Sequence, residues 1–166
     1  DDGLKVTNLF PGIDAEMQVV TGAVKTTFYV HSWQMGDFNE VLLVDKYQKG
    51  MQPLQFYYEN VLVKKGRVAG EVLAKEGKHP VLQIGKAFMY TDEDPTASID
   101  LPYEIGQESL GIVLVESDVM TLLQKGPVII DPLVQGREGR YTPTTPLNSF
   151  RTRDNAGNYS SIRTMN

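Results

Sequence analysis

Two histidines are the residues of this chain best suited to proton transfer near neutral pH. His31 lies in a strand-like run next to Trp33, and His79 stands before Pro80 in the segment KEGKHP. General acid–base catalysis needs such a group to be oriented by a partner in a concave site. No spacing in the sequence ties either histidine to a serine or a carboxylate, so we predict that the chain is not an enzyme. An enzyme that uses His31 with an acidic partner remains an alternative hypothesis.

The common signatures of catalysis and cofactor binding are missing from the sequence. There is no cysteine, which excludes disulfides, thiolate metal sites and cysteine nucleophiles. The phosphate-binding glycine patterns, G-x-S-x-G and H-E-x-x-H are also absent. The acidic residues Asp92, Glu93 and Asp94 are adjacent, so they point in different directions and lack the spacing of a calcium loop. We predict no cofactor and no metal site.

The elements that must position these side chains are predicted to be short strands. Six segments are rich in β-branched or aromatic residues and have Gly, Pro, Asp or Asn at their edges. They cover residues 24–33, 54–63, 67–74, 85–90, 110–116 and 126–134. Strands at this spacing predict a mainly β fold, either a β-sandwich or a small β-barrel, with little helix and extended terminal arms.

Three connecting segments give more local predictions. Val119 to Gln124 is the one helix candidate, with Ser117 or Asp118 as its N-cap. KEGKHP is typical of a hairpin loop in which Gly77 takes a positive φ. Residues 90–110 are acidic and interrupted by proline, which favours an exposed loop.

Charge and composition divide the chain into a body and a tail. Residues 1–136 contain eleven basic and nineteen acidic side chains, whereas residues 137–166 contain five arginines and two carboxylates. The tail is poor in aliphatic residues, so it cannot build a core of its own. We therefore predict a β-rich body at 1–136, with an N-terminal arm at about 1–20, and an Arg-bearing C-terminal arm or tail at 137–166. The tail lacks the dense basic run of a nucleic-acid-binding segment.

A series of short motifs crosses the middle of the chain. The series is VLVKKGRVAGEVLA at 61–74, GKAFMYTDEDP at 85–95, ESLGIVLVESDV at 108–119 and QKGPVII at 124–130. This order resembles the head-decoration and cement proteins of tailed bacteriophages. The matching residues are Lys65, Gly66, Val68, Gly70, Val72, Gly85, Lys86, Asp92, Gly111, Ile112, Leu114, Glu116, Lys125, Gly126 and Val128. Lipoyl and biotinyl carriers share part of the pattern, but Lys75 and Lys78 lack the setting of a modifiable lysine.

The resemblance implies a structural protein on the exterior of a virion, which binds the assembled phage head and stabilises it. The implied partners are the major capsid protein and further copies of this chain, in a dimer or trimer, without direct contact to nucleic acid or membrane. From composition we predict these interface residues: Phe10, Trp33, Tyr141, Phe150, Arg151 and Arg153. The alternative is a secreted or periplasmic β-domain that binds a small ligand or a protein partner.

Overall fold

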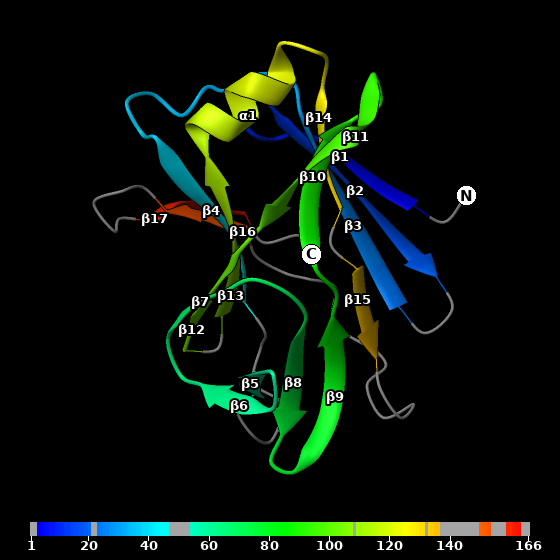
Figure 1. Ribbon diagram of the computed structural model, residues 1–166, viewed down its shortest axis with the longest axis vertical. Helices are drawn as coiled ribbons and strands as arrows, with labels where there is room; N and C mark the ends of the chain where they lie inside the picture. Colours follow the sequence, from blue (N-terminus) through cyan, green and yellow to red (C-terminus); the bar gives the residue numbers. More distant parts are fainter. Residues whose placement is uncertain are drawn as a thin grey trace.

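The chain folds into two antiparallel β-sheets and one short helix, as the computed structural model in Figure 1 shows. The structure describes residues 3–20, 23–46, 54–107, 109–131, 133–136, 150–153 and 159–163. Within these ranges the larger sheet has eleven strands and the smaller sheet has six. The predicted mainly β fold with little helix is confirmed, and the arrangement is that of a β-sandwich.

The larger sheet forks at strand β3 (Ala23–Val30). One side of β3 pairs along its whole length with β2 (Ile13–Val20), which in turn pairs with β1 (Gly3–Phe10). The other side is shared end to end by β14 (Val128–Ile130) and β15 (Leu133–Gly136). Residues 3–20, which the sequence suggested as an arm, are therefore joined to the body as a hairpin of this sheet.

The two branches of the fork have different lengths. From β14 the sheet continues through β10 (Ala87–Thr91) to the edge strand β11 (Asp94–Leu101). From β15 it continues in the order β9 (His79–Ile84), β8 (Val72–Glu76), β5 (Leu54–Tyr58) and β6 (Val61–Val63). The turn between β8 and β9 contains Gly77 with φ +61°, which confirms the predicted hairpin loop.

The smaller sheet is centred on two strands that are apolar on both faces. Its order is β17 (Tyr159–Arg163), β16 (Phe150–Arg153), β4 (Glu40–Lys46), β13 (Ser109–Val115), β12 (Tyr103–Gly106) and β7 (Gly66–Val68). Val41 and Leu43 of β4 pack into the core between the sheets. Leu42, Val44 and Val113 form a second, separate apolar cluster. Burial on both faces explains the unbroken apolar runs of β4 and β13, because a strand with one wet face would alternate.

The main core lies between the sheets and is shared by both. Met89 and Ile130 of the larger sheet and Ile105 and Leu114 of the smaller sheet are almost completely buried there. Helix α1 (Glu116–Leu123) follows β13 directly and buries Val119 and Leu122. These apolar contacts account for the cohesion of a body that contains no disulfide.

The helix begins three residues before the predicted start at Val119. Helix α1 begins at Glu116, its N-cap is Val115, and no side-chain hydrogen bond caps it. The predicted caps Ser117 and Asp118 therefore lie inside the first turn, where Asp118 faces the positive end of the helix dipole.

Residues 90–110 are not the exposed loop that their acidity suggested. They contain strands β11 and β12, and Tyr103 and Ile105 are buried. Thr96, Ser98 and Asp100 are exposed on β11, which is paired on one edge only. An edge strand tolerates this many polar residues because half of its surface faces water.

The predicted strand at 67–74 is divided between the two sheets. Strand β6 ends at Val63, Lys64 and Lys65 connect the two sheets, and β7 belongs to the smaller sheet. The chain then returns to the larger sheet as β8. Gly70, with φ +141°, stands in this return, where a Cβ atom would lie 3.2 Å from the Tyr58 ring.

Candidate interaction surfaces

The predicted interface residues of the body have two different environments. Phe10 is only 3% exposed and packs in the core at the end of β1, so its side chain offers no surface to a partner. Trp33 is half-buried against the core, and its Nε1 donates a hydrogen bond to the Phe38 carbonyl at 3.2 Å. Tyr141 lies outside the described residues. Composition alone does not show that Phe10 is buried, because burial depends on tertiary packing.

The C-terminal predicted residues share one strand at the side of the smaller sheet. Strand β16 pairs with β4 in the register Phe150↔Asp45 and Arg153↔Leu42, and Arg151 lies between them. Strand β17 pairs with β16, and Figure 1 shows this hairpin beside β4. The Arg-bearing segment therefore contributes an added strand to a sheet.

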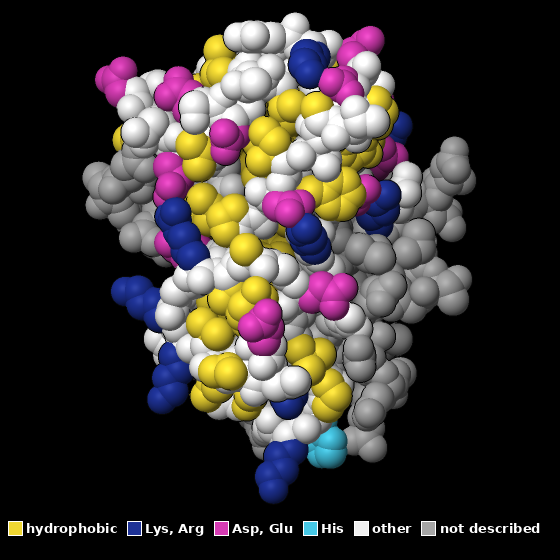
Figure 2. All heavy atoms as spheres, viewed as in Figure 1, with side chains coloured by type: hydrophobic (Ala, Val, Ile, Leu, Met, Phe, Trp, Pro, Cys, Tyr) yellow, Lys and Arg dark blue, Asp and Glu magenta, His cyan; other side chains and the backbone are white. Residues whose placement is uncertain are grey.

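One end of the body combines exposed apolar side chains with lysines. Val61 is 65% exposed and Leu62 is also exposed on the short edge strand β6. The exposed residues Lys64 and Lys65 follow at once. Figure 2 shows Lys and Arg side chains projecting around the lower part of the molecule, next to hydrophobic side chains. We call Val61, Leu62, Lys64 and Lys65 the basic end.

A second surface combines exposed apolar side chains with carboxylates. Met120 of α1 is 45% exposed, Phe38 is exposed in the loop before β4, and the exposed pair Asp92 and Glu93 forms the turn between β10 and β11. We call Phe38, Met120, Asp92 and Glu93 the acidic end.

Two contacts hold the parts of the acidic end together. Lys125, just after α1, donates from Nζ to Asp94 Oδ2 at 2.7 Å. The Glu116 N–H donates to the Asn39 carbonyl at 2.8 Å, which ties the helix to the loop before β4. The hydrogen bond from Lys125 is the largest cause that lowers the pKa of Asp94, and the bond from Thr96 adds to it. The turn, the helix and the loop therefore form one surface.

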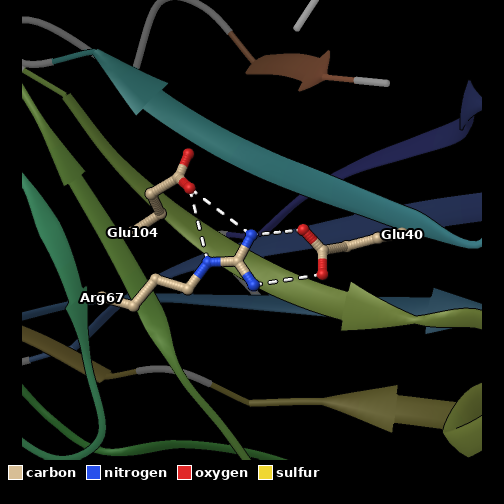
Figure 3. Close-up of polar contacts among 3 residues, drawn as sticks. All are labelled: Glu40, Arg67 and Glu104. Carbon is tan, nitrogen blue, oxygen red and sulfur yellow. Dashed lines mark hydrogen bonds and ion pairs between the residues drawn. The ribbon is translucent and has the colours of Figure 1, made fainter. Parts of the chain in front are cut away.

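An ion-pair network stabilises the strand next to the basic end. Figure 3 shows Arg67 of β7 between Glu40 of β4 and Glu104 of β12. Arg67 Nη1 donates to Glu40 Oε2 at 3.1 Å, Nη2 donates to Glu40 Oε1, and Nε lies 3.4 Å from Glu104 Oε1. The bonds to Glu40 are the main cause that raises the pKa of Arg67. This network fixes the chain immediately after Lys64 and Lys65.

His31 has an acidic neighbour that the sequence did not reveal. Its Nε2 lies 2.9 Å from Asp14 Oδ2, and its backbone N–H donates to the Gly12 carbonyl at 2.8 Å. The other Asp14 oxygen accepts the Asn8 N–H at 2.7 Å. The bond from Asn8, followed by that from His31, lowers the pKa of Asp14. These bonds join the β1–β2 turn to the end of β3, which gives the pair a structural role.

A metal-binding cluster and a membrane-spanning helix are both absent from the described part of the chain. No group of three or more His, Asp or Glu residues there is placed to hold a metal ion. No helix among the same residues is long and apolar enough to cross a membrane. Comparison with known protein families, with curated protein sequences and with solved structures finds no match to this chain.

Proposed function

We propose that this chain is a structural protein of a virus particle, a decoration or cement protein that binds the assembled head from outside. The observation that carries the proposal is the position of the Arg-bearing C-terminal hairpin on the side of β4. Sheet edges are where one chain commonly adds a strand to another. A peripheral hairpin of this kind suits a clamp between subunits better than it suits a catalytic or ligand-binding pocket.

The motif order between residues 61 and 130 supports the family to which the proposal refers. Its residues lie in the framework of both sheets: Gly66 and Val68 are in β7, Ile112 and Leu114 in β13, and Val128 in β14. The resemblance is therefore one of framework. The functional part of the proposal depends on the C-terminal segment, whose composition differs from that of the body.

The physical task of such a protein is to bind one state of the shell and not the others. A ligand that binds only the assembled state stabilises it by mass action, in proportion to the logarithm of its concentration over its Kd. The arginines of β16 provide charge that pairs with carboxylates of a shell subunit, and such contacts weaken as salt rises.

Quantitative peptide mass spectrometry on purified virus particles from the source culture tests the proposal. A decoration protein is expected at a fixed, high ratio to the main shell protein. Absence from particles, together with recovery from the medium or the periplasm, would contradict the proposal and favour a secreted binding domain.

Charge reversal then tests the C-terminal segment. In the full chain, Arg151→Glu with Arg153→Glu is expected to weaken binding to stripped particles by about tenfold or more, which corresponds to about 1.4 kcal/mol. Lys5→Glu with Lys86→Glu makes the same change in net charge on exposed residues of the body. This control is expected to bind as the unmodified chain does. Equal binding by all three proteins would remove the arginines from the interface.

A further inference from the structure

The basic end and the acidic end lie far apart in the molecule. Figure 1, drawn with the longest axis vertical, shows α1 at the top and the β5–β6 hairpin in the lower part. Figure 2, in the same view, shows carboxylates spread over the upper half, while Lys and Arg predominate at the lower tip. The two ends therefore cannot contact each other within one copy.

The numbers of basic and acidic side chains differ between the two ends. Residues 54–84, which build the lower hairpins, carry five basic and three acidic side chains. Residues 85–131, which include β10, β11 and α1, carry two basic and nine acidic side chains. Opposite charge at opposite ends is the arrangement that steers two copies toward each other end to end.

Apolar exposure coincides with the two ends. Six large hydrophobic residues are exposed among the described residues, and four of them belong to these ends: Phe38, Met120, Val61 and Leu62. Each end therefore combines two exposed apolar side chains with two exposed charged ones, a combination that is common in protein–protein contacts. A single exposed apolar residue is ordinary on a protein surface. Two exposed apolar residues together with charged ones at each end favour an interaction surface.

The charges at the two ends are not neutralised within the described part of the chain. Asp94 and Asp100 already pair with Lys125 and Lys86. No ion pair between described residues engages Lys64, Lys65, Asp92 or Glu93. These four side chains remain available to a partner.

The backbone also holds the basic end in a costly conformation. The β5–β6 turn consists of Glu59 and Asn60, with φ +48° and +64°. A two-residue turn of this kind prefers Asn and Gly, so Glu59 is strained there. The tight turn presents Val61 to solvent.

We propose that the basic end of one copy binds the acidic end of the next copy. Lys64 and Lys65 lie opposite the turn of Asp92 and Glu93 across this contact, and the edge strand β6, with Val61 and Leu62, lies against Phe38 and Met120. Because the two surfaces differ, the contact is heterologous: it closes into a ring if the rotation allows and otherwise continues as a chain. The contact is a property of the free protein and does not depend on the decoration role.

Sedimentation velocity of the full chain over a range of concentrations at low salt tests this contact. The unmodified protein is expected to associate, and association is expected to weaken as salt rises. Lys64→Glu with Lys65→Glu makes both ends acidic, and Asp92→Lys with Glu93→Lys makes both ends basic. Each variant alone is expected to associate at least about tenfold more weakly than the unmodified chain. An equimolar mixture of the two is expected to associate again, because every contact then joins opposite charges.

Two further variants distinguish this contact from general charge effects. Lys5→Glu with Lys86→Glu changes net charge as the lysine variant does, but off both ends, and is expected to associate normally. Val61→Ser with Leu62→Ser is expected to reduce association at every salt concentration. If the basic variant at residues 92 and 93 fails to fold by circular dichroism, Asp92→Asn with Glu93→Gln replaces it. A monomeric unmodified chain, or reversal variants that associate like the unmodified chain, would overturn the proposal.

Discussion

Arg67 and Glu40 form a two-pronged ion pair across the smaller sheet, although β12 and β13 lie between their strands. Arg67 reaches over its direct cross-strand neighbour Glu104, with which it also bonds, to the first residue of β4. One side chain therefore connects three of the six strands. Strand β7, only three residues long and at the edge, has this connection in addition to its backbone pairing with β12.

Loss of this ion pair is expected to destabilise the body slightly. Arg67→Ala should lower the free energy of unfolding by about 1 kcal/mol, since the pair is partly exposed and screened by water. Arg67→Lys keeps the charge but cannot form the fork, so it should restore only part of the loss. Urea unfolding at low and high salt measures both effects. Equal stability of all three proteins at low salt would contradict this role.

Gly12 is expected to be intolerant of any side chain. Its φ is +76°, and a Cβ atom there would lie 2.4 Å from the Ser32 carbonyl oxygen. Gly12→Ala should therefore cost about 3 kcal/mol or more, from the clash and the backbone together. Gly36, with φ +61° and no atom within 4 Å of its Cβ position, is the matched control. Gly36→Ala should cost about 1 kcal/mol, and thermal unfolding compares the two.

The Asp94–Lys125 contact is expected to make stability depend on acid pH. The hydrogen bond from Lys125 lowers the pKa of Asp94 in the folded chain, so folding favours the ionised carboxylate. This contribution is complete above about pH 4 and disappears as pH falls through the lowered folded pKa. Asp94→Asn should therefore melt at a lower temperature than the unmodified chain at pH 7 but not at pH 2. Lys125→Met should give the same pH profile, and a difference that persists at pH 2 would contradict the assignment.

Tyr103 is expected to make stability depend on alkaline pH. Its ring is buried, and its hydroxyl donates to the Gly85 carbonyl at 2.6 Å. Burial raises the pKa of Tyr103, so the unfolded chain ionises this group first and stability falls as pH rises above about 10. Tyr103→Phe should cost about 1 kcal/mol at pH 7 and should reduce the alkaline loss.

Tyr58→Phe is the control for Tyr103. Tyr58 donates a comparable hydrogen bond, 2.8 Å to the Ala69 carbonyl, from a more exposed position. Water replaces this bond more easily, so the loss of stability should be smaller. If the two substitutions reduce the alkaline loss of stability equally, burial of Tyr103 is not the cause.

The sequence by itself determined the class of the fold, because short runs of β-branched and aromatic residues between Gly, Pro, Asp and Asn favour strands. It predicted the Gly77 turn, since a two-residue connection between strands needs a positive φ. Composition also marked the segment 137–166 as different from the rest of the chain, but it did not show that residues 150–153 pair with β4. The run VLVKK contains the residues of the basic end, but nothing in the local sequence indicates that Val61 and Leu62 remain exposed.

Tertiary structure alone decided which strands pair. Periodicity reports burial and not the identity of a neighbour, so the fork at β3 and the transfer of β7 to the smaller sheet left no local trace. The same limit applies to surfaces. Phe10 and Phe38 are the same residue type in similar turn-rich settings, yet one is in the core and the other is exposed. Strand pairing and burial both depend on contacts between residues distant in sequence, of which Arg67 with Glu40 is an example.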